Sequence, residues 1–251
     1  MAPSGAHRER HRTDRFSRLT RISFRVIGIP VVFGPAILVG LLVLGVLSRL
    51  TDAYLAEWVV LGFVALLLHE LGHALAFRRY GVESSITFWL LGGFTVPTDQ
   101  DAAERLTERQ LLVVTVAGPL VGLVIGAATL AIGAALNLRA APDEIREPVF
   151  LWLFVNLAWG LFNLMPISSL DGGGAIEHLA GAAFGRAGRA IGLAVCIVAS
   201  GLIALAATTA GLYSIAVIAV VFGLLNPGPY RGLLDEVRHR AGSDRSVEDS
   251  D

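Results

Sequence analysis

The chain has 251 residues, of which 54% are hydrophobic and only 16% are charged, and its net charge is −1. Long uncharged runs in so apolar a chain exclude an ordinary soluble protein and indicate an integral membrane protein. We therefore expect the lipid bilayer, and no nucleic acid, as a partner.

Uncharged or nearly uncharged stretches predict six membrane-spanning helices. A helix needs about 20 apolar residues to cross a bilayer. The expected spans cover residues 26–48, 58–77, 111–137, 149–169, 190–208 and 211–227. The predicted fold class is thus an all-α polytopic membrane protein, with one membrane domain at 26–230 and polar tails at 1–25 and 231–251.

The arginines predict how these spans are oriented. All 20 basic residues are arginines, and seven of them lie between Arg8 and Arg25. Six spans put both termini on one side, and only Arg49, Arg139 and Arg146 then fall on the other. Because basic residues concentrate in cytoplasmic loops, we expect a multi-pass protein of the cell membrane with both termini in the cytoplasm. The first span is expected to be a retained anchor, and a cleaved signal peptide is the alternative. The lysine-free, arginine-rich composition favours a bacterial source.

The stretch LLLHELGHALAF places three ionisable side chains in the second predicted span. His69 and His73 are four residues apart, so on a helix they project from one face, about one turn apart. Two imidazoles at this spacing can bind one zinc ion, with Glu70 beside them as general base, as in the H-E-x-x-H pattern of metalloproteases. A charged group near the bilayer centre costs roughly 2.5–3.5 kcal/mol on insertion scales, so such groups usually mark function.

A third zinc ligand is expected from another span, because catalytic zinc generally has three protein ligands and one open position. The fourth predicted span runs into NLMPISSLDGGG, where Pro166 breaks the helix. The glycines at 172–174 predict an irregular backbone beyond Asp171. Asp171 is the candidate third ligand, at a similar depth to the histidines. The alternative is that it caps a cytoplasmic helix that starts directly after it.

Together, HELGH, the later NLMPISSLDGG and the AGP between them (Ala117 to Pro119) resemble the site-2 protease family of intramembrane zinc metalloproteases. The resemblance covers the chain from about Trp58 to Gly174 and is to a minimal, PDZ-free bacterial member. Gly174 departs from the family, which usually has a basic residue there. The resemblance implies one zinc ion, three ligands, a catalytic base and an asparagine that acts at the substrate or transition state. In this chain the resemblance implies that the ligands are His69, His73 and Asp171. It implies that Glu70 is the base and that Asn163 is the asparagine.

The family's re-entrant segment has a candidate in FWLLGGFTVP, within a predicted β-like stretch at 86–97 that is too short to span a bilayer. Its Gly92–Gly93 pair and the β-branched Thr95–Val96 indicate an edge to which an extended substrate could add as a strand. Gly92, Gly93 and Asn163 are therefore the candidate substrate-binding residues. The alternative is a cytoplasmic loop that dips into the lipid headgroups.

The resemblance implies hydrolysis of peptide bonds within or near transmembrane segments. The expected substrates are membrane-tethered regulators, such as anti-sigma factors or membrane-bound transcription factors. Two other functions use the same residues: a membrane metal transporter and a catalytically inactive membrane chaperone. A transporter has no need of Glu70 beside its ligands, and a chaperone has no need to keep all four groups of the site.

Overall fold

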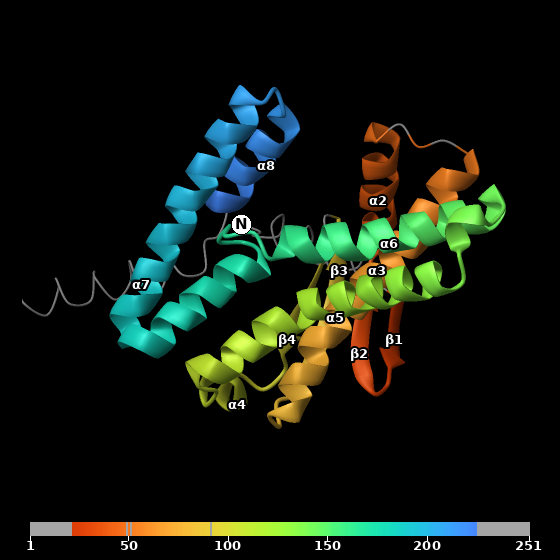
Figure 1. The fold of residues 1–251 in the computed structure, drawn as a ribbon. Coiled ribbons are helices and arrows are strands. Elements are labelled where there is room, and N and C mark those ends of the chain that lie inside the picture. Colours follow the sequence, from red (N-terminus) through yellow and green to blue (C-terminus); the bar gives the residue numbers. More distant parts are fainter. Residues whose placement is uncertain (1–21, 49, 51, 91, 225–251) are drawn as a thin grey trace, which may run out of the picture. The chain divides into compact units, whose positions relative to one another are not determined.

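The computed structural model describes residues 22–48, 50, 52–90 and 92–224 (Figure 1). The elements in chain order are β1 Ile22–Val26, β2 Ile29–Phe33, α2 Ala36–Leu47, α3 Asp52–Arg79, β3 Ser84–Trp89, β4 Gly92–Pro97, α4 Gln100–Glu104, α5 Glu108–Ala135, η1 Leu138–Ala140, α6 Asp143–Asn163, α7 Asp171–Thr209 and α8 Tyr213–Leu224. The chain divides into two compact units between Asn163 and Leu164. Most of the two predicted tails, residues 1–21 and 231–251, lies outside the described residues.

The mostly helical fold confirms the predicted class, and it is joined by a four-stranded sheet in the order β1-β2-β3-β4. The two outer pairs are antiparallel hairpins, whereas β2 and β3 run parallel, with Val31 opposite Ile86. Strands β3 and β4 form the β-like segment predicted at 86–97. Its insertion into a bilayer stays a prediction.

The helical span predicted at 26–48 is wrong. Its first part completes the β1–β2 hairpin, and only Ala36–Leu47 is helical. The absence of charge did not distinguish a buried strand from a helix here. Residues 26–33 are rich in β-branched side chains, which favour strands. Pro30 removes a backbone donor that a helix would need, and Pro35 stands just before α2 begins, where proline is tolerated.

The outer edge of β4 is open within the described part of the chain, because no described strand pairs with it. Thr98 N–H donates to the carbonyl oxygen of Glu83 at 2.8 Å, one step beyond the last pair of the β3–β4 ladder. Hydrogen-bonded and non-hydrogen-bonded pairs alternate along an antiparallel ladder. Counting from this bond, the backbone N–H and C=O groups of Gly93 and Thr95 point away from β3 toward the open edge.

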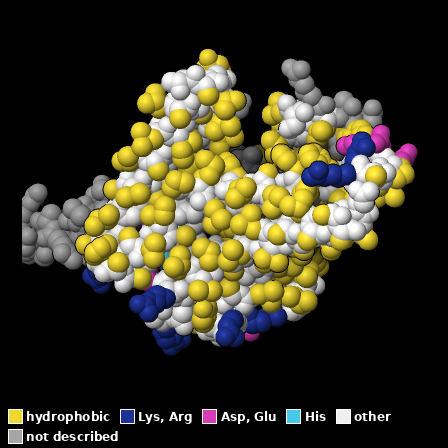
Figure 2. Space-filling model, in the orientation of Figure 1, with side chains coloured by type: hydrophobic (Ala, Val, Ile, Leu, Met, Phe, Trp, Pro, Cys, Tyr) yellow, Lys and Arg dark blue, Asp and Glu magenta, His cyan; other side chains and the backbone are white. Residues whose placement is uncertain are grey.

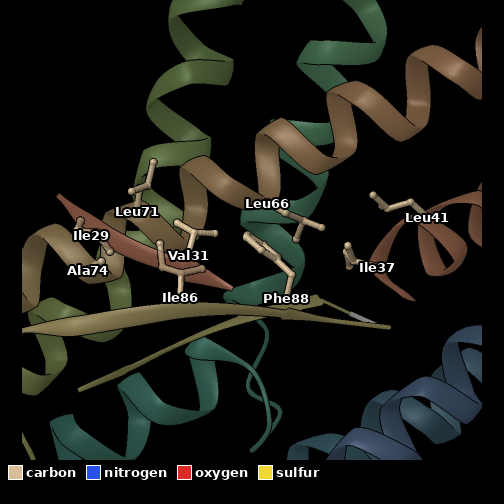
Figure 3. Close-up of a cluster of buried hydrophobic side chains, with 9 residues drawn as sticks. All are labelled: Ile29, Val31, Ile37, Leu41, Leu66, Leu71, Ala74, Ile86 and Phe88. Atoms are coloured by element: carbon tan, nitrogen blue, oxygen red, sulfur yellow. The ribbon is translucent and has the colours of Figure 1, made fainter. Parts of the chain in front are cut away.

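One apolar core joins the sheet to α3 and α2 (Figure 3). Alternate residues of β2 and β3 point to the same face, where they meet the side chains of α3. The buried members are Ile29, Val31, Ile37, Leu41, Leu66, Leu71, Ala74, Ile86 and Phe88. The indole N–H of Trp58 also donates to the carbonyl of Leu41 at 2.9 Å and ties α2 to α3. The sheet is thus fixed to the helix that carries the H-E-x-x-H motif.

The surfaces of α5 and α6 have the distribution of side chains expected of helices in lipid (Figure 2). Large apolar side chains such as Val124, Phe150 and Leu161 are 60–65% exposed. Exposed arginines gather instead at the end of α3 and around the start of α5, including Arg78 and Arg109. A broad apolar surface of this kind indicates contact with lipid rather than water.

The second unit contains α7 and α8. Helix α7 bends at Gly185, which has φ 63° and ψ −142°, and the segments on either side fold back on each other, so that Cys196 Sγ lies 3.7 Å from the carbonyl oxygen of Gly173. The irregular backbone predicted beyond Asp171 is wrong, because α7 begins at Asp171 and includes the glycines that follow. A Cβ at Gly172 would lie 2.2 Å from the carbonyl oxygen of Leu164. These glycines therefore let the preceding turn pass against the start of the helix.

Four helices are long and apolar enough to cross a membrane among the residues that the structure describes: α3, α5, α6 and α7. Helices α2 and α8 have 12 residues each as described. Helix α7 ends at Thr209 and α8 begins at Tyr213, close to the predicted boundary between the last two spans. The count of six spans is not confirmed, and the orientation of the termini stays a prediction.

Candidate metal centre

Helix α3 brings the two histidines of the motif together. His69 Nε2 and His73 Nε2 are 3.2 Å apart, and the two rings lie nearly at right angles, at 78°. Two nitrogens bound at 2.0–2.1 Å to one tetrahedral zinc ion would be about 3.3 Å apart. Both side chains are buried, with exposed fractions of 6% and 8%. The spacing of the pair thus fits two ligands of a single metal ion.

The carbonyl oxygen of Val114 fixes which nitrogen of His73 can bind a metal. His73 Nδ1 lies 2.8 Å from this oxygen, on α5. A carbonyl can only accept a hydrogen bond, so Nδ1 carries the proton and donates it. The lone pair of a neutral imidazole is then on Nε2, the nitrogen that faces His69. Metal-binding histidines are commonly oriented in this way by a carbonyl or carboxylate partner.

Two glycines allow α3 and α5 to approach each other at this point. A Cβ at Gly72 would lie 2.7 Å from the carbonyl oxygen of Ala117, and a Cβ at Gly118 would lie 2.2 Å from His73 Nε2. Real Cβ atoms do not tolerate such distances, so these positions require glycine. The glycine of the AGP segment therefore leaves the space in which His73 presents its ligand nitrogen.

Strand β4 holds Glu70 in place, as α5 holds His73. Thr95 Oγ1 donates to Glu70 Oε2 at 2.8 Å and lies 3.1 Å from the backbone carbonyl oxygen of the same residue. A Cβ at Gly93 would lie 2.7 Å from Glu70 Cγ. Glu70 is only 4% exposed. Gly93 and Thr95 are two residues apart and so share one face of the strand, which is the face toward Glu70.

The other predicted site residues belong to elements other than α3. Asn163 is the last residue of α6, and its Nδ2 donates to the carbonyl of Trp159 at 3.0 Å. Asp171 is the first residue of α7, in the second unit. A Cβ at Gly92 would meet no described atom within 4 Å. The ligand role of Asp171, the catalytic role of Asn163 and substrate binding by Gly92 and Gly93 stay predictions.

Sequence reasoning missed two contributors to this centre, the hydroxyl of Thr95 and the carbonyl of Val114. Both are common groups that no motif singles out, and each depends on how another element packs against α3. Thr95 was noted in the sequence only as a β-branched residue of the candidate edge strand, which gave no sign of the contact of its hydroxyl with Glu70. For Val114, the only signal was the nearby AGP segment.

Comparison with known proteins finds a similarity to metallopeptidases. Residues 58–140 match the family model described as Peptidase family M50. Rip3 of Mycobacterium tuberculosis is 34% identical over 145 residues, which cover 53% of this chain and 36% of that protein. The zinc metalloprotease MJ0392 of Methanocaldococcus jannaschii is 29% identical over 152 residues, which cover 60% of this chain and 42% of that protein. The chain thus spans less than half the length of these curated relatives.

A solved structure shares the fold. The site-2 protease from Methanocaldococcus jannaschii has a TM-score of 0.56 and 23% sequence identity, and the match covers 81% of this chain and 92% of that one. This likeness shows a shared fold, and the M50 match covers most of the helix that carries the H-E-x-x-H motif. The chain thus resembles the site-2 protease family of M50 metallopeptidases, both in the residues around its H-E-x-x-H motif and in its fold.

Proposed function

We propose that the chain is an intramembrane zinc metalloprotease that hydrolyses peptide bonds within or near the transmembrane segments of other proteins. The observation that carries this proposal is the arrangement on α3. His69 and His73 present two nitrogens 3.2 Å apart, and Glu70 lies between them in the sequence with its carboxylate held by Thr95. A metal transporter would need the two nitrogens but would gain nothing from a fixed carboxylate beside them.

The metal is proposed to be one zinc ion bound by His69, His73 and Asp171. Each residue offers one ligand atom, a ring nitrogen from each histidine and a carboxylate oxygen from the aspartate. Two imidazoles and one carboxylate form a ligand set that catalytic zinc uses in metalloproteases and that leaves its fourth position open. The family resemblance supports the same three ligands.

Zinc bound there would supply Lewis acidity, which makes water a nucleophile near neutral pH and polarises a carbonyl group. Glu70 would take the proton from the attacking water. It would then deliver this proton to the nitrogen of the scissile bond, so that the C–N bond breaks and an acid and an amine result. Its burial and the hydrogen bond from Thr95 hold the carboxylate in a defined place. Asn163 is proposed to act at the substrate or transition state, as the resemblance implies.

The substrate is proposed to add to β4 as an extended strand. A transmembrane helix hides its carbonyl groups in i→i−4 hydrogen bonds, so a protease must first unwind it locally. The open edge at Gly93 and Thr95 offers backbone groups that can replace those bonds. The same two residues touch Glu70, so a strand paired with them would lie beside the proposed base.

Removal of zinc is expected to abolish cleavage, and its return to restore it. The assay uses purified protein in detergent or liposomes with a model protein that has a single transmembrane helix. A chelator should stop cleavage because the reaction has no other source of activated water. Added zinc should recover the rate, whereas magnesium, which prefers oxygen ligands, should not. A chelated protein that cleaves as fast as the untreated one would rule out the zinc mechanism.

Cross-linking is expected to show that the bound substrate is extended. The side chains of Phe94 and Val96 are exposed on the face of β4 away from Glu70, so a cysteine at either position can reach a paired strand. In a Glu70→Gln background, Phe94→Cys should form disulfides with every second position of a cysteine-scanned substrate. The natural Cys196 is fully buried and contributes little background. Cross-links at every third or fourth position would mean that the substrate stays helical.

The substrates are proposed to be membrane-tethered regulators such as anti-sigma factors or transcription factors, as the resemblance implies. The enzyme would act in the cell membrane as a multi-pass protein with cytoplasmic termini. The exposed apolar surfaces of α5 and α6 support a place in the bilayer. A Glu70→Gln protein that binds substrates without cutting them would allow them to be isolated with it.

A further inference from the structure

Thr95 connects the open edge strand to the proposed catalytic base. Its hydroxyl donates to Glu70 Oε2 at 2.8 Å and also lies within hydrogen-bonding distance of the Glu70 carbonyl oxygen, at 3.1 Å. A hydroxyl has one proton to donate, and hydrogen bonds to charged groups are the stronger ones. The shorter distance, to the carboxylate, therefore marks the principal bond. The longer distance, to the carbonyl oxygen, shows that the Thr95 hydroxyl also lies close to the backbone of α3.

The same residue faces the place where a substrate strand would pair. The alternation of the β3–β4 ladder directs the backbone N–H and C=O of Thr95 to the open edge, while its side chain points to α3. The main chain of Thr95 thus faces the open edge where a substrate would pair, and its hydroxyl donates to the proposed base, Glu70. Gly93, two residues earlier, also packs against Glu70. A Cβ at Gly93 would lie only 2.7 Å from Glu70 Cγ, so the glycine leaves the room that the glutamate side chain needs.

We propose that Thr95 is a positioning residue that holds the Glu70 carboxylate in its reactive orientation and couples this orientation to the seating of an extended substrate on β4. The inference rests on the proposed function. A glutamate side chain has three rotatable bonds, so its carboxylate takes a defined place only where neighbours restrict it. Thr95 and Gly93 supply that restriction from a single strand. Pairing of a substrate with this strand would immobilise both.

A purely structural role for Thr95 makes a different prediction. If the hydroxyl only pinned β4 to α3, its loss would loosen the strand and weaken substrate binding or metal binding. If it orients the base, its loss should leave binding intact and slow the chemical step. A hydroxyl that orients a catalytic group without itself touching the substrate typically changes the rate through geometry. The separate effects on kcat and KM therefore distinguish the two roles.

The test compares Thr95→Val, which keeps the β-branched shape but removes the hydroxyl, with Thr95→Ser, which keeps the hydroxyl. Thr87→Val is the matched control. Thr87 is a half-buried threonine on β3, and its side chain makes no hydrogen bond with any residue that the structure describes. All variants are measured as full-length, zinc-loaded protein on the model transmembrane substrate, with zinc content determined for each.

We expect Thr95→Val to lower kcat about tenfold with KM within about twofold of wild type, a fraction of the 10²–10⁴ that a general base typically contributes. Thr95→Ser should recover most of kcat, and Thr87→Val should match wild type. The inference is overturned if Thr95→Val cleaves like wild type, if serine fails to rescue it, or if it loses zinc or raises KM instead. A wild-type protein without zinc-dependent cleavage would overturn the proposed function itself.

Discussion

Replacing Glu70 with glutamine is expected to lower the rate of cleavage by about 10²–10⁴-fold, the usual contribution of a general base. Glutamine has nearly the same shape and its amide oxygen can still accept the hydrogen bond from Thr95 Oγ1. It cannot take a proton from water. Zinc binding should be unchanged, because His69 and His73 keep their spacing and His73 keeps its hydrogen bond to Val114. The rate on a model transmembrane substrate and the zinc content per protein together check this expectation.

Glu57→Gln is a suitable control for this variant. Glu57 lies on the same helix, 13 residues before Glu70, which is about 20 Å along an α-helix at 1.5 Å per residue. The substitution removes the same charge far from the histidines and should leave cleavage unchanged. Equal rates in wild type and Glu70→Gln would exclude Glu70 as the base. Loss of zinc in Glu70→Gln would show instead that Glu70 acts through the metal site.

Gly118→Ala is expected to remove metal binding and, with it, cleavage. The added Cβ would lie 2.2 Å from His73 Nε2 and 2.6 Å from Cε1, so the ring must turn away. The ring has little freedom to do so, since its Nδ1 is bound to Val114 on the same helix. The helices cannot move apart without opening the close approach of Gly72 to Ala117. Loss of a partner that only orients a metal-binding histidine already costs 10–100-fold in affinity, and here the ligand nitrogen itself is displaced.

Gly133→Ala is the matched control on the same helix. Its Cβ would find its nearest neighbour, Leu138 Cδ1, at 3.8 Å, an ordinary van der Waals contact. Alanine in a helix interior is favoured over glycine by roughly 0.5–1 kcal/mol, so this variant should be at least as stable as wild type. Zinc titration and thermal unfolding of both variants provide the comparison. Wild-type zinc affinity in Gly118→Ala would show that His73 is not held as described.

The sequence was sufficient to predict local features of the centre but not the contacts that support it. The four-residue spacing of His69 and His73 predicted a shared helix face, and the structure confirms it, because helical geometry follows from local spacing alone. The β-like segment at 86–97 was predicted from its glycines and β-branched residues and is also confirmed. These features depend on residues close together in the chain.

What the sequence could not predict depends on packing between distant elements. The bond from Thr95 to Glu70 joins residues 25 positions apart, and that from His73 to Val114 joins residues 41 positions apart. Neither partner belongs to a recognisable motif. The span at 26–48 was predicted wrongly because lack of charge is common to a helix in lipid and a strand in an apolar core. The pairing of β2 with both β1 and β3 completes this segment as a strand.

The open edge of β4 has a consequence for which proteins such an enzyme would cut. Under the proposed strand addition, the edge at Gly93 and Thr95 pairs with the main-chain groups of the substrate. Every residue offers an N–H and a C=O for this pairing, except proline, which has no N–H. A template of this kind is largely indifferent to side-chain identity. Which substrates are cut would then depend on how readily their transmembrane helix unwinds at the depth of the metal. Cut sites should therefore cluster at weak points such as glycine and share no consensus sequence.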